Sequence, residues 1–182
     1  MLRRFAVCSI VLLATGCVSI PDGVRTRIAS KSGLSPAHCH LLSSEHALRS
    51  PPPATVPEPT LALLDPNRIQ VMIWNMLKGS RDGWGHEFIR YAGDQDLMVL
   101  QEVALSSELE RFIGRSGMSW DLAVAFERGD QPTGVMTVSR AIPNRACVQR
   151  TMEPFIWLPK SSLVSHFPIA GSDRQLVVAN VH

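Results

Sequence analysis

Two apolar stretches decide the fold, and the clearer of them is residues 96–102, which read DLMVLQE. The four residues from Leu97 to Leu100 are all apolar, without the alternation of a strand that has one face in water. Such runs are typical of strands covered on both faces. Residues 69–74, IQVMIW, have the same character and contain the β-branched residues that strands favour. We therefore expect two buried central strands, each followed by polar residues.

The segments that follow predict further elements of both kinds. Residues 107–110, SELE, form a capping box, which predicts a helix that glycines at 114 and 117 would end. A short helix is also expected within residues 85–91. Further strands are expected at 121–126, 135–138, 162–166 and 176–181. This order favours a mixed α/β domain with more than one sheet layer.

Composition limits the class of protein. The chain has 182 residues, a formal charge of +2, and is 45% hydrophobic, 19% charged and 6% aromatic. These values exclude a disordered chain, a collagen-like chain and a polytopic membrane protein. Once the first sixteen residues are set aside, sixteen basic residues balance sixteen acidic ones. A strongly basic nucleic-acid clamp is therefore not indicated, although a local basic patch stays open.

Residues 1–16 have the features of an export signal. Arg3 and Arg4 precede an apolar run at 5–13, which is far shorter than the ~20 residues that span a bilayer. The small residues before Cys17 resemble the lipobox of bacterial lipoproteins, so we expect Cys17 to carry a lipid anchor. Ordinary signal cleavage nearby is the alternative. Because no aspartate follows Cys17, the predicted location is the bacterial outer membrane within the cell envelope.

Residues 17–67 are predicted to form a lipidated, proline-rich tether, because prolines at 51–53, 57 and 59 favour extended geometry. The folded domain is expected at 68–182. After export, Cys39 and Cys147 are the cysteines left for pairing, since Cys8 lies inside the signal. An oxidising periplasm permits a disulfide between them, and two unconnected thiols are the alternative.

Three polar residues stand at the ends of predicted strands: Asn75, Glu102 and His182. Strand-end loops are where α/β folds place reacting groups. A carboxylate with an amide oxygen suits Mg²⁺ or Mn²⁺, and a histidine can contact phosphate or transfer protons. Each residue also has a structural interpretation: a turn cap for Asn75, a solvated strand end for Glu102, and a terminal residue for His182.

Four stretches in one order resemble the endonuclease/exonuclease/phosphatase family, whose members include secreted deoxyribonucleases, sphingomyelinases and inositol-polyphosphate phosphatases. They are residues 73–79 (IWNMLKG), 96–103 (DLMVLQEV), 133–140 (TGVMTVSR) and 178–182 (VANVH). The resemblance covers residues 69–182. It implies the amino-terminal part of a four-layer α/β/β/α sandwich of the deoxyribonuclease I type.

The resemblance also assigns roles to residues. It implies that Glu102 binds the divalent metal, that Asn75 helps to position it, and that His182 contacts the scissile phosphate or assists proton transfer. Lys78 lies where relatives often have a basic residue near the site, and an exposed surface lysine is its alternative. For Arg140 a phosphate contact stands against a structural role in a turn.

Later family segments resembling Gly-Asp-Phe-Asn and Ser-Asp-His have no counterpart before the chain stops at His182. We therefore expect an incomplete domain whose water-activating group is missing, and a reaction that is slow or absent. The resemblance implies a Mg²⁺- or Mn²⁺-dependent hydrolase of phosphodiesters or phosphomonoesters, acting on nucleic acid or phospholipid head groups. The alternative is a non-catalytic envelope lipoprotein that has a binding role.

Overall fold

The computed structural model describes residues 18–20, 25–28, 31–36, 39–41, 63–154 and 158–182. Lipidation at Cys17 and the export signal lie outside these residues. Within them, no helix is long and apolar enough to span a bilayer.

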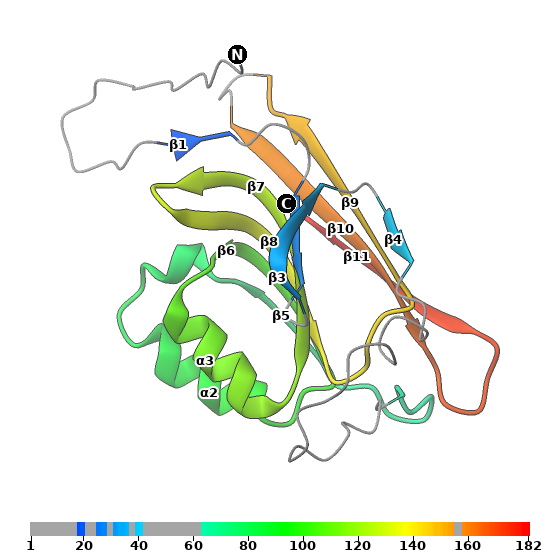
Figure 1. Ribbon diagram of the computed structural model, residues 1–182. Helices are drawn as coiled ribbons and strands as arrows, with labels where there is room; N and C mark the ends of the chain where they lie inside the picture. The colour runs from blue at the N-terminus through cyan, green and yellow to red at the C-terminus, as the bar shows by residue number, and fades with distance from the viewer. Residues whose placement is uncertain (1–17, 21–24, 29–30, 37–38, 42–62, 155–157) are drawn as a thin grey trace.

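The larger of two sheets holds the pair of strands predicted first (Figure 1). Its strand order is β3-β2-β7-β8-β6-β5, and β1 pairs with β7. Strands β5 and β6 run parallel, whereas the other described pairs of this sheet run antiparallel. The strands are β1 (Val18–Ser19), β2 (Arg25–Ile28), β3 (Lys31–Pro36), β5 (Val71–Asn75), β6 (Leu97–Ala104), β7 (Ser119–Arg128) and β8 (Gln131–Ser139).

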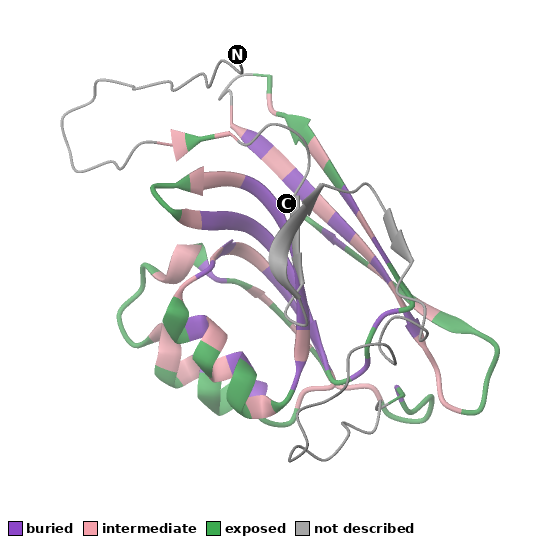
Figure 2. Cartoon of the chain, in the orientation of Figure 1, coloured by how far each residue is buried: buried purple, intermediate pink, exposed green. Residues whose placement is uncertain are grey.

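The second sheet is antiparallel throughout and has the order β11-β10-β9-β4. Its strands are β4 (Cys39–Leu41), β9 (Arg145–Met152), β10 (Pro159–Pro168) and β11 (Gln175–Val181). Burial alternates strictly along β10, which Figure 2 shows as alternating colours, because successive side chains point to opposite faces. The buried set faces the larger sheet, so the two sheets enclose a core.

Two α-helices in the described part of the chain, α2 (Trp84–Ala92) and α3 (Ser107–Ser116), lie against the other face of the larger sheet (Figure 1). Their buried residues Phe88, Leu109 and Ile113 pack against Leu122 and Met136 of the sheet. The alternate residues of the same strands belong to the inter-sheet core. These are Ala123 and Val135, which cluster with Leu163 of β10.

The sandwich prediction is wrong. The described residues form a mostly β structure with one mixed and one antiparallel sheet, rather than part of a four-layer α/β/β/α sandwich. Both described helices cover the same sheet, because nearly all of the described chain after Gly117 is strand and turn. The second sheet therefore has no helical layer among the described residues.

The two stretches that were predicted to be central strands behave differently. Leu97–Leu100 of β6 are buried, as their continuous apolar run predicts. The prediction for residues 69–74 is wrong in its burial, because β5 lies at the edge of its sheet and Ile73 is 72% exposed. Continuous hydrophobicity indicates a strand here but does not show that both faces are covered.

The stretch 17–67, predicted to be a tether, contributes strands to both sheets. Strands β1 and β2 pair with β7, β3 extends β2, and β4 pairs with β9. The backbone of this stretch is therefore joined to the fold at 18–19, 25–28, 31–36 and 39–41. The domain boundary at residue 68 stays a prediction.

Candidate functional site

The site begins where the parallel strands β5 and β6 end side by side. Their register places Asn75 beside Gln101, and the Met76 amide donates to the Gln101 carbonyl at 2.8 Å. Because parallel strands finish at the same edge of a sheet, Asn75 and Glu102 become neighbours. The Asn75 Nδ2 atom donates to Glu102 Oε1 at 3.0 Å.

Glu102 lies in a β-bulge. The register between β6 and β8 shifts between Leu100 and Val103, and Glu102 has a φ of 48°, in the left-handed region. This conformation disfavours residues that carry a Cβ atom, and bulges often re-aim side chains beside functional sites. The bulge interrupts the regular alternation of side chains at the position of the carboxylate.

The Glu102 carboxylate receives donors on both oxygens. Lys78 Nζ forms an ion pair with Oε2, and His182 Nε2 lies 3.3 Å from Oε1, the oxygen that also accepts from Asn75. The hydrogen bond from Lys78 is the largest cause that lowers the pKa of Glu102 to about 2, and the bond from Asn75 is the next. Partial burial opposes this shift. Glu102 is therefore a carboxylate at any physiological pH.

Lys78 is fixed by an unusual turn. Residues Leu77–Gly79 form a 3₁₀ turn, in which Leu77, Lys78 and Gly79 have φ values of 46°, 59° and 67°. The Asn75 Oδ1 atom accepts from the Leu77 amide at 3.0 Å. Asn75 thus links this turn to Glu102, since its amide nitrogen binds the carboxylate and its oxygen binds the turn.

His182 reaches the site from the second sheet. Asn180 of β11 is fully buried and donates through Nδ2 to the carbonyls of Leu100 and Met136, at 3.2 and 2.9 Å. Its Oδ1 accepts from Gln101 Nε2 at 3.0 Å. These bonds join the two sheets one residue before Glu102 along β6, so the end of β11 lies over the site.

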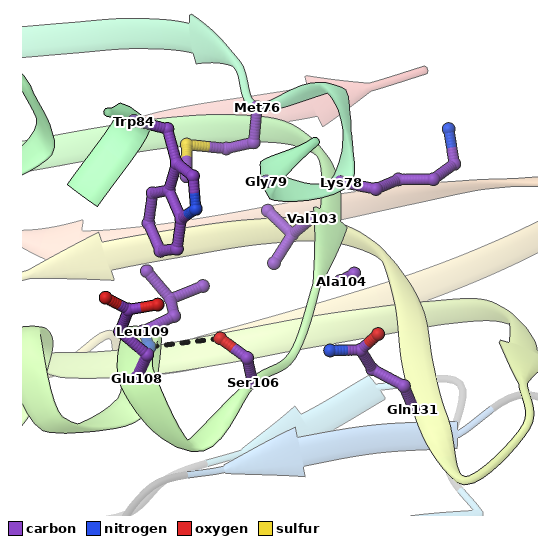
Figure 3. A pocket seen from close by; sticks show the side chains of 10 residues that line it. All are labelled: Met76, Lys78, Gly79, Trp84, Val103, Ala104, Ser106, Glu108, Leu109 and Gln131. Atoms are coloured by element: carbon purple, nitrogen blue, oxygen red, sulfur yellow. Dashed lines mark hydrogen bonds between the residues drawn. The ribbon is translucent and has the colours of Figure 1, made fainter. Parts of the chain in front are cut away.

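Two hollows border this cluster, and Lys78 lines both. The smaller has a volume of about 70 Å³ and is lined by Lys78, Glu102, Lys160, Ser161 and His182 among others. The larger, about 200 Å³, lies between the 3₁₀ turn and the start of α3 (Figure 3). Its residues are Met76, Lys78, Gly79, Trp84, Val103, Ala104, Ser106, Glu108, Leu109 and Gln131. In Figure 3 the Lys78 side chain extends away from Trp84 and from the larger hollow.

Comparison with known proteins finds similar chains that are named UPF0294 proteins. A UPF0294 protein of Yersinia pseudotuberculosis is 38% identical over 130 residues, which cover 71% of this chain and 48% of that protein. UPF0294 proteins of Vibrio vulnificus and Klebsiella pneumoniae are 34% and 36% identical over 115 residues, 63% of this chain and 40% and 43% of theirs. The chain thus spans less than half the length of these curated relatives. No family model and no solved structure matches it.

The structure brings four of the predicted residues together: Asn75, Lys78, Glu102 and His182. Arg140 is not among them. Its guanidinium donates to the carbonyls of Gly93 and Gln95 at 2.8 and 3.0 Å, beside the start of β6 and at the opposite end from Glu102. Its contacts fit the alternative interpretation, a structural role in a turn.

Sequence reasoning missed how the site is assembled. Asn180 was noted only as part of a motif, although a single polar residue inside the apolar run LVVANV is a signal for a buried hydrogen-bonding role. Lys160, which lines the smaller hollow, was not proposed at all. No pattern in the sequence indicates the bulge at Glu102.

The donor set is compatible with a partly open Mg²⁺ site. Within the described part of the chain, no three His, Cys, Asp or Glu side chains come together as metal ligands. Glu102 supplies one carboxylate, while the Asn75 nitrogen faces that carboxylate and the Asn75 oxygen accepts from the Leu77 amide. Mg²⁺ keeps several waters and takes one or two carboxylates together with substrate phosphates, so Glu102 fits it as an incomplete set. Asn75 would add its oxygen only with its amide group turned over.

The predicted cysteine pair lies in the second sheet, away from these side chains. The register of β4 against β9 places Cys39 directly opposite Cys147. Cys147 is disulfide-bonded. Pairing between these two positions would join β4, in the stretch predicted to be a tether, to the second sheet.

Proposed function

We propose that this chain supplies part of the active site of a divalent-metal-dependent phosphoester hydrolase. The observation that carries the proposal is the convergence of Asn75, Lys78 and His182 on the ionised carboxylate of Glu102. These side chains come from β5, the following turn, the end of β6 and the end of β11. The resemblance to the endonuclease/exonuclease/phosphatase family gives the same four residues their roles.

The chemistry follows from the charges of the cluster. Glu102, whose carboxylate Asn75 positions through its Nδ2 atom, would hold Mg²⁺ or Mn²⁺, which when bound neutralises phosphate charge and makes phosphorus more susceptible to attack. Lys78 adds a second positive charge. His182 lies at the rim of the smaller hollow, where its imidazole can donate to a phosphate oxygen or transfer a proton.

The proposed substrates are phosphodiesters or phosphomonoesters of nucleic acid or phospholipid head groups. We place the protein in the bacterial cell envelope, anchored by a lipid on Cys17. In-line hydrolysis also needs a group that activates water, and the four clustered residues include no second carboxylate for that purpose. We therefore propose the activity for the whole protein. This chain spans less than half the length of the curated relatives that it matches.

Hydrolysis of bis(p-nitrophenyl) phosphate and of single-stranded DNA by the whole protein, with Mg²⁺ and with EDTA, tests the proposal. We expect Glu102→Ala to lower the metal-dependent rate by at least about a hundredfold, because it removes the charged ligand. The matched control is Glu87→Ala, which removes a half-buried carboxylate of α2 that also pairs with a cation, Arg90. Equal rates for wild type and Glu102→Ala would overturn the proposal. Absence of metal-dependent hydrolysis in the wild type would favour the non-catalytic envelope lipoprotein.

A further inference from the structure

The Glu102 carboxylate is already neutralised by a cation that belongs to the protein. Lys78 pairs with Oε2, while Asn75 and His182 share Oε1. A divalent ion that binds Glu102 must therefore share or replace the contact that Lys78 makes. A salt bridge with a purely structural role would show the same contact. The surroundings of Lys78 must therefore distinguish a fixed salt bridge from one that a cation can displace.

The backbone of Lys78 is anchored while its side chain is not. The Leu77 amide binds Asn75 Oδ1, and the turn has three consecutive left-handed residues, which fix where the chain of Lys78 begins. Among the described residues the ammonium contacts Glu102 alone, and the side chain is 32% exposed. Four side-chain torsions separate the ammonium from this anchored backbone. The ammonium can therefore move without any change in the turn.

The neighbourhood offers the ammonium a second position. Lys78 borders the smaller hollow, whose lining also includes His182, Lys160 and Ser161. Of these, His182 can donate to a phosphate oxygen, whereas the Lys160 ammonium pairs with Glu153 and the Ser161 hydroxyl donates to the Ala123 carbonyl. A phosphate beside Glu102 would lie within the reach of the Lys78 side chain.

The energetics favour exchange. Partly exposed ion pairs contribute little to stability, and at equal distance a divalent ion attracts a carboxylate twice as strongly as an ammonium does. We propose that Lys78 is an exchangeable counter-ion: it neutralises Glu102 before a divalent cation binds, is displaced by that cation, and then contacts the substrate phosphate. This inference rests on the proposed cation site at Glu102.

Two opposite effects of one substitution test it. In Lys78→Met the length and apolar stem of the side chain remain but the charge is lost. We expect Mn²⁺, followed by electron paramagnetic resonance of the free ion, to bind about five- to tenfold more tightly, because no cation must be displaced. With saturating Mg²⁺, inorganic phosphate should bind about tenfold more weakly by calorimetry, because its ammonium partner is missing.

The matched control is Arg81→Met, which removes one positive charge three residues away, from an exposed side chain that is not among the described contacts of Glu102. It should change either affinity less than twofold. Unchanged or weaker Mn²⁺ binding in Lys78→Met would overturn the exchange. Tighter Mn²⁺ binding with unchanged phosphate binding would overturn the second role of Lys78.

Glu102→Gln, made alone and together with Lys78→Met, separates failure of this inference from failure of the proposed function. If Mn²⁺ binding is lost in Glu102→Gln but is not tightened by Lys78→Met, the cation site is supported and the exchange of Lys78 is refuted. If Mn²⁺ does not bind to wild type or to Lys78→Met, or if Glu102→Gln does not change its binding, the proposed cation site at Glu102 is refuted. Circular dichroism of each variant checks that the fold is retained.

Discussion

At the scale of single residues, the backbone of Glu102 is strained. A left-handed φ of 48° costs a residue with a Cβ atom about 1 kcal/mol, and glycine avoids this cost. We therefore expect the free energy of unfolding of Glu102→Gly to exceed that of Glu102→Ala by about 1 kcal/mol, although both lack the carboxylate. Urea denaturation measures the difference. The usual order within strands, with alanine the more stable, would contradict a left-handed residue 102.

Asp121 is a second unusual titratable residue, and it lies inside the fold. Its side chain lies on β7 in the inter-sheet region, is 4% exposed, and its Oδ1 has no hydrogen-bond partner among the described residues. Burial raises the pKa of this carboxyl from 3.8 to about 7. The folded state therefore binds a proton that the unfolded state releases above about pH 4.

The consequence is a loss of stability as the pH rises. Between about pH 4 and pH 7 the contribution of Asp121 to the free energy of unfolding should fall by up to about 4 kcal/mol and then level off. Asp121→Asn cannot ionise and should lack this fall. Urea denaturation of both proteins at pH 4.5 and pH 8 checks it. A difference between the two proteins that is the same at both pH values would refute the buried-carboxyl explanation.

Where strands run parallel, the sequence predicts which polar residues lie side by side. Asn75 and Glu102 follow β5 and β6, whose parallel pairing makes their ends meet. The same reasoning is misleading for Arg140, because β8 runs antiparallel to β6 and Ser139 lies opposite Leu97, at the start of β6. The position of His182 depends on how two sheets pack, which a one-dimensional pattern does not contain.

At the scale of elements, helix α3 begins one residue earlier than its capping box predicts. Ser106, and not Ser107, is the N-cap: its Oγ accepts from the Leu109 amide at 3.1 Å. Ser107 satisfies the capping-box pattern with Glu110, whereas three residues after Ser106 comes Leu109, so the pattern selects the wrong one of two adjacent serines. The sequence therefore predicts the helix. The first residue of the helix, however, depends on the backbone conformation between β6 and the helix.

The pair of serines provides its own control. Ser106→Ala should lower the free energy of unfolding by about 1 kcal/mol, because the Leu109 amide loses its partner. Ser107→Ala, an exposed position in the first turn, should change it by less than about 0.5 kcal/mol. Thermal or urea unfolding of the two variants decides between the caps. Equal losses, or a larger loss for Ser107→Ala, would show that Ser106 is not the N-cap.

At the scale of the whole molecule, the arrangement of layers is what the sequence predicts least well. Alternation within β10 and the continuous apolar run of β6 indicate strands. Neither pattern shows which sheet a strand joins, and β5 and β11, with similar apolar runs, lie at the edges of different sheets. Sheet membership depends on pairing between segments far apart in the chain, such as β4 with β9.

Asn180 connects this arrangement of layers to the site. It is fully buried, and its amide binds the carbonyls of Leu100 and Met136 in the facing sheet. Asn180→Leu keeps the approximate size of the side chain but leaves these buried carbonyls without their donor. We expect the free energy of unfolding to fall by about 2–4 kcal/mol, since unsatisfied buried polar groups are costly. Urea denaturation measures this loss.

Asn144→Leu is the matched control, because Asn144 is exposed and no side-chain hydrogen bond is described for it. Its stability should change by less than about 0.5 kcal/mol. In Asn180→Leu the end of β11 is no longer bound to β6, so His182 should also lose its position beside Glu102. Metal-dependent hydrolysis should then fall even at temperatures where the variant is fully folded. A destabilised variant that retains wild-type hydrolysis when folded would show that His182 is placed by β10 alone, through the hydrogen bond from its amide to Ser161.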